Sequence, residues 1–177
     1  TSDKAEIGIG HTRWATHGEP NDVNSHPHTS TNGKIAVVHN GIIENYTALK
    51  VQLQSQGHVF YSDTDTEIMA KLIEQFYKDP EVLSLEKAVQ LATRQVNGTY
   101  GIAVLHEDFP DLMVVARRGS PLLLGVGDNE MIVASDASAV AEYTDKVVYL
   151  DDNETAVIRR DSYEVQDNSY VLMDKKV

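Results

Sequence analysis

The sequence predicts one α+β domain in which the helices are segregated from a largely antiparallel sheet. Two observations carry this prediction. Apolar residues recur at helical spacing in two segments of the first half, whereas from Thr99 onward short apolar runs alternate with turn residues. Helices followed by a run of strands are typical of the α+β class. The length of 177 residues predicts a single domain over residues 1–177.

Composition excludes several classes of protein. There are 27 acidic against 15 basic residues, for a formal net charge of −12, which disfavours a nucleic-acid partner. The chain has no run of about 18 apolar residues, so we expect no membrane span. It contains no cysteine. This excludes disulfides, thiolate metal sites and a cysteine nucleophile within the chain, and it fits a reducing compartment, so we expect a cytoplasmic location.

The first strands are predicted at the N-terminal side of the chain. Glu6–Thr12 reads as a strand with glycines at alternate positions, which suggest close approach by another backbone or a ligand. Residues 13–34 form a polar stretch that exceeds the usual loop length. Ile35–His39 is a short apolar strand, and Asn40-Gly41 directly after it is typical of a turn.

Three helices are predicted next. Tyr46–Gln56 is the first, with Gly57 as its C-terminal stop, and His58–Tyr61 is a candidate short strand. Thr64–Lys78 shows the clearest apolar stripe, and Thr64 with Glu67 fits a capping box. Ser84–Val96 is the third helix, with Ser84 as its cap.

The second half of the chain is predicted to be mainly β-strand. Short apolar runs punctuated by Gly, Asp and Asn give six strands, a helix starting near Asp136, and one or two further strands in Ser162–Val177. The six predicted strands are Tyr100–His106, Leu112–Ala116, Leu122–Val126, Met131–Ala134, Val147–Leu150 and Thr155–Arg159.

Histidine is concentrated in the first third of the sequence. Six of the seven histidines lie in the first 58 residues, and His26-Pro27-His28 suggests a metal site. However, two histidines that flank a proline in extended chain point to opposite sides, and there is no HExxH motif or thiolate. We therefore favour histidines that hydrogen-bond around a polar pocket, and we expect no metal.

Three further features have both a structural and a functional interpretation. Arg13-Trp14 is either a surface stack or a carboxylate-binding guanidinium beside a covering indole. Asn40-Gly41 is either a hairpin turn or an oxyanion hole built from a side-chain amide and a backbone N–H. Asp63 and Asp65 are either favoured by the helix dipole or bind an ammonium group. Together the functional interpretations match the carboxylate, ammonium and amide groups of free glutamine.

Several motifs closely resemble a known family. HTRWATHG (11–18), NSHPH (24–28), VVHNGIIENY (37–46) and TDTE (64–67) resemble the glutaminase domain of the glucosamine-6-phosphate synthase family. Further similar strings are NGTYGIAVL (97–105), ARRGSPLLLGVG (116–127) and IVASD (132–136). The resemblance covers nearly the whole chain, in the same order. Related class II amidotransferases carry looser versions of these motifs.

The resemblance implies a fold and a reaction. The fold would be the N-terminal-nucleophile (Ntn) hydrolase type, a four-layer αββα sandwich, here truncated at its N-terminus. The family hydrolyses L-glutamine, and a sugar isomerase domain of the same chain uses the ammonia to convert fructose 6-phosphate to glucosamine 6-phosphate. No metal or organic cofactor is implied.

The resemblance also implies roles for individual residues. Arg13 would hold the substrate carboxylate and Asp65 its α-ammonium, while Asn40 and Gly41 would form the oxyanion hole. The remaining implied positions are Trp14, Thr16 and His17 in a loop that closes over glutamine and His26 in the pocket.

The family's nucleophile is an N-terminal cysteine, which this sequence lacks. We therefore expect a fragment without glutaminase activity of its own. Thr1 is a second candidate for an N-terminal nucleophile, but the stretch that follows it is polar and offers no apolar strand to hold it. A different class II amidotransferase and a non-catalytic glutamine-binding module are also compatible with these motifs. Because a missing strand would leave sheet edges unpaired, we expect a homo-oligomer.

Overall fold

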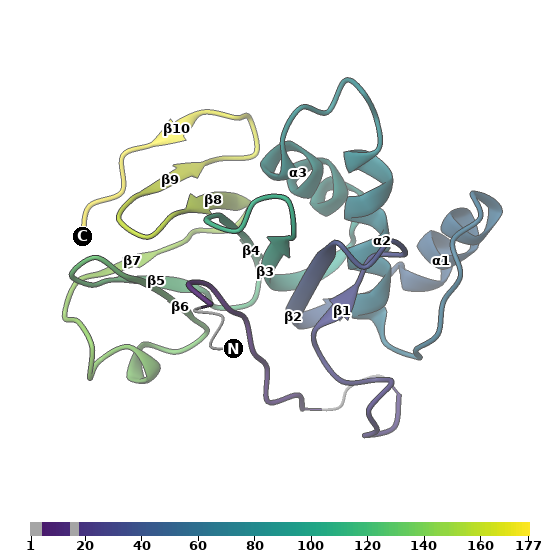
Figure 1. Cartoon of the computed structure of the whole chain (residues 1–177), viewed down its shortest axis with the longest axis horizontal. Coiled ribbons are helices and arrows are strands. Elements are labelled where there is room, and N and C mark those ends of the chain that lie inside the picture. The colour runs from purple at the N-terminus through teal and green to yellow at the C-terminus, as the bar shows by residue number, and fades with distance from the viewer. Residues whose placement is uncertain (1–4, 15–17) are drawn as a thin grey trace.

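A computed structural model describes residues 5–14 and 18–177 of the chain. It confirms the α+β class, with three helices gathered on one side and two antiparallel sheets beside them (Figure 1). Among the described residues, no helix is long and apolar enough to cross a membrane.

The larger sheet has seven strands, and every neighbouring pair is antiparallel. Its central pair is β2 and β3, which are matched over nine consecutive residue pairs from Ile35–His106 to Ile43–Gly98. In spatial order the strands are β1 (His28–Thr29), β2 (Ile35–Ile43), β3 (Gly98–His106), β4 (Met113–Arg118), β8 (Glu154–Ile158), β9 (Tyr163–Gln166) and β10 (Leu172–Met173).

The smaller sheet has three strands, with β5 (Leu123–Val126) between β6 (Met131–Ala134) and β7 (Val147–Tyr149). The helix expected near Asp136 is a short 3₁₀ turn, η1 (Ala137–Ala139). A β-carbon at Gly125 would lie 3.1 Å from Thr144 and 3.2 Å from Val140, so the segment after η1 packs directly on this strand. A side chain at position 125 would push that segment away.

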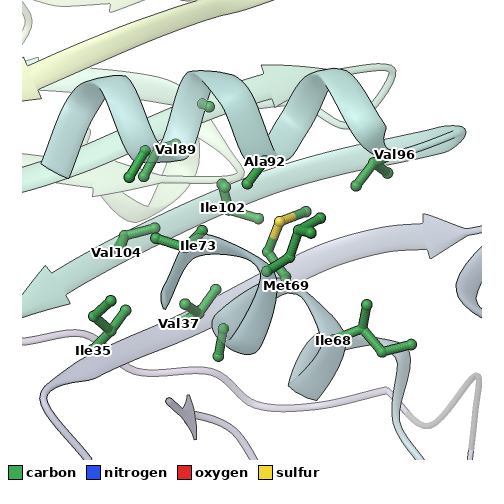
Figure 2. Close-up of a cluster of buried hydrophobic side chains, with 14 of the residues drawn as sticks. Ile35, Val37, Ile68, Met69, Ile73, Val89, Ala92, Val96, Ile102 and Val104 are labelled. Carbon is green, nitrogen blue, oxygen red and sulfur yellow. The ribbon is translucent and has the colours of Figure 1, made fainter. Parts of the chain in front are cut away.

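The three helices are α1 (Tyr46–Ser55), α2 (Asp65–Tyr77) and α3 (Leu85–Gln95). Two of them, α2 and α3, cover one face of the larger sheet, and α1 packs on α2. Side chains of α2 and α3 interdigitate with those of β2 and β3, as Figure 2 shows for Met69, Ile73, Val89, Val37 and Ile102. All five are fully buried. The 3.6-residue stripes seen in the sequence are therefore the faces that meet the sheet.

Two of the three helix-end features predicted from the sequence are confirmed. Gly57 has φ +90°, and the amides of Gly57 and His58 donate to the carbonyls of Gln54 and Leu53, as in a Schellman motif. The Ser84 side chain accepts a hydrogen bond from the Lys87 amide. The capping box predicted at the start of α2 is wrong, because Glu67 instead accepts hydrogen bonds from the amides of Tyr61 and Ser62.

This use of Glu67 also explains a strand that does not form. The strand predicted at His58–Tyr61 is wrong, and the segment is irregular chain, because the Tyr61 amide is bound to a carboxylate rather than to a neighbouring strand. Burial alone would raise the pKa of Glu67, yet its hydrogen bonds with Ser62 and Tyr61, together with the nearby Lys71 ammonium, lower it overall.

A second core lies between the two sheets, and the segment 5–14 contributes to it. Ile7 and Ile9 pack against this core, whereas Gly8 and Gly10 are exposed. The segment thus has the alternation of a strand, but the strand predicted at Glu6–Thr12 is wrong, since no ladder pairs it within the described residues. A β-carbon on either glycine would meet nothing within 4 Å, so no described backbone approaches them closely, and close approach by a ligand stays a prediction.

The turn predicted at Asn40-Gly41 is also wrong. Strand β2 runs through both residues and ends at Ile43. Beyond Gly41, the Ile42 amide donates to the Thr99 side chain and the Ile43 amide donates to the Asp65 carboxylate. Side-chain acceptors therefore satisfy this end of the strand, and the chain does not need to reverse there.

Candidate functional site

A cavity of about 810 Å³ lies between the segment 8–14, strand β2, the start of α2 and strand β6. Six of the eight residues singled out from the sequence line it, namely Arg13, Trp14, His26, Asn40, Gly41 and Asp65. The other two, Thr16 and His17, lie outside the described residues, as does Thr1. Residues that are far apart in sequence thus line one cavity, and their roles in binding remain predictions.

Asn40 and Gly41 hold their place through the register of β2 on β3. Asn40 pairs with Gly101, and Gly41 pairs with Tyr100. Gly41 has φ +132°, and a β-carbon there would lie 2.2 Å from the Thr99 carbonyl oxygen. Only glycine tolerates both the dihedral angle and this close approach. The backbone beside Asn40 therefore has a shape that no other residue could reproduce.

Asp65 is the first residue of α2, and only 4% of its surface is exposed. One carboxylate oxygen accepts the Ile43 amide at 2.8 Å, and the other lies 4.0 Å from His39 Nδ1. A carboxylate in the first turn of a helix is stabilised by the helix dipole. The Asp65 carboxylate is therefore held at a fixed position on the cavity wall.

Arg13 lies near the C-terminal end of the segment 8–14. Its guanidinium donates to the backbone carbonyls of Gly18 and Glu19, at 3.1 and 3.2 Å. Its own backbone has φ +43°, which is unusual for a residue with a side chain. The neighbouring Trp14 is 88% exposed. This indole stands at the rim of the cavity without packing against the core.

Histidines and one threonine form a hydrogen-bonded network under the cavity. The Thr66 hydroxyl contacts His26 Nε2 at 2.8 Å and His39 Nδ1 at 3.1 Å, and His39 Nε2 lies 3.3 Å from the Thr99 carbonyl. Burial, followed by the positive charges of His11, His28 and His39, lowers the pKa of His26 to about 3. The network is consequently neutral at His26 near pH 7.

The rings of His26 and His28 lie on the same side of the chain, with their centroids 5.2 Å apart. The expectation that they point to opposite sides is therefore wrong, because residues two apart in an extended chain lie on the same face. The His28 ring is nevertheless engaged elsewhere, because its Nε2 contacts the Thr64 hydroxyl at 2.8 Å. Within residues 5–14 and 18–177, no group of three or more His, Asp or Glu side chains is arranged to hold a metal ion.

Comparison with known families gives this geometry a context. The family described as "Glutamine amidotransferase domain" matches residues 1–174. The chain belongs to this family. In this amidotransferase domain the residues that line the cavity include Arg13, Asp65 and Asn40, which carry a guanidinium, a carboxylate and a side-chain amide.

Individual relatives of this amidotransferase domain share a more specific name. It is 54% identical over 173 residues to the glutamine–fructose-6-phosphate aminotransferase (isomerizing) of Chlorobaculum tepidum and 52% identical over 172 residues to that of Bacteroides thetaiotaomicron. These matches cover 98% and 97% of the chain. The chain spans 28% of the length of each of these relatives.

Solved structures confirm the Ntn-hydrolase fold of the amidotransferase domain. The glutamine phosphoribosylpyrophosphate amidotransferase of B. subtilis is similar with a TM-score of 0.72 and 27% identity, over 92% of this chain and 35% of that one. A glutamine aminotransferase class-II domain protein from Silicibacter pomeroyi shares the fold, with a TM-score of 0.56 at 16% identity, over 87% of this chain and 74% of that one.

Sequence reasoning missed parts of the amidotransferase cavity. Strand β6 and the residues after it line one wall from Met131 to Asp136, although the sequence analysis assigned no site residue to the IVASD motif there. His11 also lines the cavity and contacts Asn40, at 2.5 Å from His11 Nε2 to Asn40 Oδ1. The alternation of Ile7 and Ile9 with Gly8 and Gly10 is the sequence signal that could have placed His11 on the same side as the two isoleucines.

Proposed function

We propose that the cavity binds L-glutamine and that the chain supplies the glutamine-binding part of a glutaminase site. We further propose that the whole protein is a glutamine–fructose-6-phosphate aminotransferase (isomerizing). The observation that carries the first proposal is the position of Arg13, Asp65 and Asn40 on the wall of one cavity. The identity of 54% to a relative with that name supports the second.

Each recognition group of glutamine has a partner in this proposal. Arg13 binds the α-carboxylate, and a planar guanidinium does so with two parallel hydrogen bonds. Asp65 binds the α-ammonium through a buried, dipole-stabilised carboxylate. Trp14 covers the ligand, together with Thr16 and His17 of the same loop, while His26 supports the pocket as a neutral ring.

The reacting end of glutamine meets Asn40 and Gly41. A nucleophile that attacks the amide carbonyl generates an oxyanion, which the Asn40 side-chain amide and the Gly41 backbone N–H stabilise. The chain contains no cysteine, so we propose that it binds glutamine without hydrolysing it. Release of ammonia for conversion of fructose 6-phosphate to glucosamine 6-phosphate belongs to the whole protein, which includes a sugar isomerase domain.

The proposal also covers the domain, its location and its oligomeric state. Residues 1–177 form one incomplete glutamine amidotransferase domain, the location is cytoplasmic, and the protein is a homo-oligomer. The first is supported by a family match that runs from residue 1 to 174, and the second by the absence of cysteine. Light scattering on the purified chain tests the third, since a monodisperse monomer would contradict it.

A titration with L-glutamine tests the binding proposal. Isotope-labelled chain is titrated to high glutamine concentration, and chemical-shift changes of the cavity residues give the affinity. Asp65→Asn is expected to weaken binding about 10- to 100-fold, the equivalent of one charge-assisted hydrogen bond. Because an asparagine oxygen can still accept the Ile43 amide, the fold should persist.

Asp63→Asn is the matched control, since it removes one carboxylate two residues away at a position that does not line the cavity. It should bind glutamine as the parent chain does. Equal weakening by both variants, or no response of the cavity residues to glutamine, would refute the proposed site. Release of glutamate from glutamine by the cysteine-free chain would refute the proposed inactivity.

A further inference from the structure

We propose that His11 is a positioning residue that fixes the orientation of the Asn40 carboxamide, so that its NH₂ group is the part left for a ligand in the cavity. The contact itself is independent of function, but its consequence for glutamine rests on the proposed function. Nothing in the sequence motifs distinguishes His11 from the other histidines of this region. The assignment comes from two hydrogen bonds made by one imidazole ring.

The first hydrogen bond fixes the tautomer of His11. The backbone amide of Arg13 lies 2.9 Å from His11 Nδ1. A backbone N–H can only donate, so Nδ1 accepts with its lone pair and carries no proton. In a neutral imidazole the proton is then on Nε2.

The second hydrogen bond links this tautomer to the orientation of the Asn40 side chain. His11 Nε2 lies 2.5 Å from the Asn40 side-chain oxygen. Since Nε2 carries the proton, it donates, and the atom that it meets must be the carboxamide oxygen and not the nitrogen. The reversed amide would bring two donors into contact. The amide orientation, which is ordinarily ambiguous, is therefore determined by the backbone of Arg13 acting through one ring.

The surroundings of His11 hold the ring in this position. It is half-buried on the same side of the extended segment as Ile7 and Ile9, which pack into the core between the sheets. Its ring lies 4.2 Å from that of His26 between centroids. His26 stays neutral because burial lowers its pKa to about 3, so it places no positive charge beside the Nε2–H group of His11.

Orientation matters because an amide presents opposite charges at its two ends. With its oxygen held by His11, Asn40 offers N–H donors, which attract the carbonyl oxygen of a substrate amide. A reversed Asn40 would offer a lone pair to that oxygen and repel it. Loss of one such donor typically lowers the rate of acyl-transfer reactions about 10²- to 10³-fold. His11 thus links the residue proposed to bind the carboxylate with the residue proposed to bind the oxyanion.

Nitrogen NMR on the full chain of 177 residues tests the tautomer directly. The imidazole of His11 should show an unprotonated Nδ1 and a protonated Nε2 near neutral pH, with signals assigned by their loss in His11→Gln. A protonated Nδ1 would overturn the proposal. This measurement needs no ligand and no activity, so its outcome is separate from that of the proposed function.

Two variants test the positioning. His11→Leu removes the donor, and we expect the Asn40 side-chain NH₂ signals to shift and broaden. His11→Gln keeps an N–H donor near the place of Nε2, and we expect these signals to return toward those of the parent chain. Asn40 signals that are unchanged in His11→Leu would overturn the proposal, as would failure of His11→Gln to restore them in a folded chain.

Glutamine affinity supplies the link to function. His11→Leu should weaken L-glutamine binding about two- to tenfold, as expected for one neutral hydrogen bond, while His11→Gln should stay near the parent value. If the parent chain and both variants fail to bind glutamine, the proposed function fails and the NMR signals alone decide the role of His11. If the parent binds and His11→Leu binds equally well, the role of His11 at the site is refuted.

Discussion

The two faces of the seven-stranded sheet differ in how they are filled. Toward the helices, β2 and β3 present Val37, Ile102 and Val104, all fully buried against α2 and α3. Toward the smaller sheet, the same two strands present Val38, Asn40 and other residues to a cavity of about 810 Å³. One strand thus contributes neighbouring residues to a dense core and to an open, polar site.

This difference separates stability from chemistry along each strand. Side chains alternate between the two faces of a sheet, so the residues of β2 that face the cavity do not have to fill the core on the helix side. Burial on the helix side supplies the stabilising free energy that lets the opposite side keep unfilled space and polar groups. The comparison can be tested by weakening each face in turn.

The largest effect on stability should come from the helix face. Ile73→Ala removes a fully buried side chain of α2 and is expected to lower the free energy of unfolding by about 2–5 kcal/mol. Val133→Ala is the matched change on β6, where the side chain is half-buried and lines the cavity. It should cost less than half as much. Urea unfolding measures both, and equal losses would show that the two faces do not differ as described.

A smaller effect should appear as a dependence on pH at the cavity face. The pKa of His26 is lowered from its ordinary 6.5 to about 3 in the folded chain. Between these values the unfolded state binds a proton that the folded state does not, so stability falls as pH decreases below 6.5. His26→Asn should remove this contribution, which is at most about 2 kcal/mol between pH 6.5 and pH 5.

The control for His26 lies in the pH range itself. Above pH 7 the ring is neutral in both states, so the parent chain and the variant should show parallel curves of unfolding free energy against pH. Divergence confined to the acid side would support a neutral His26. Identical slopes from pH 8 to pH 5 would mean that folding leaves the pKa of His26 unchanged.

The smallest effect on stability is expected at the rim. Trp14 is 88% exposed, so Trp14→Ala should change the free energy of unfolding by no more than about 0.5 kcal/mol. The same variant should weaken glutamine binding if the indole covers the ligand. Thermal unfolding together with a glutamine titration separates the two quantities. A large loss of stability would place Trp14 in the core, contrary to its exposure.

The sequence predicts best those elements whose shape depends on their own residues. Apolar spacing identifies the strands from Gly98 to Ile158 and the helices α2 and α3, and their ends are confirmed within a few residues. The strand prediction for Glu6–Thr12 fails because a strand needs a partner. The segment does alternate between inward and outward residues, but a hydrogen-bonded ladder also needs a second strand beside it.

The site is predictable in composition but not in its connections. Motif resemblance selects six residues that do line one cavity. It cannot show that the Ile43 amide binds Asp65, or that His11 contacts Asn40, because these pairs are 22 and 29 residues apart. Long-range pairing with β3 likewise carries β2 through Asn40-Gly41, where local turn preferences favour a reversal of the chain.

The continuous pairing of β2 with β3 means that the register of these two strands decides which side chains face the cavity. A shift by a single residue along the nine matched pairs would exchange the two faces of β2, so that Asn40 entered the helix core and Val37 left it. A chain with this shifted register would lose both the packing of the helix core and the arrangement of the cavity residues. We therefore expect a misaligned form to be less stable than the native one, because it would bury the Asn40 carboxamide among apolar side chains.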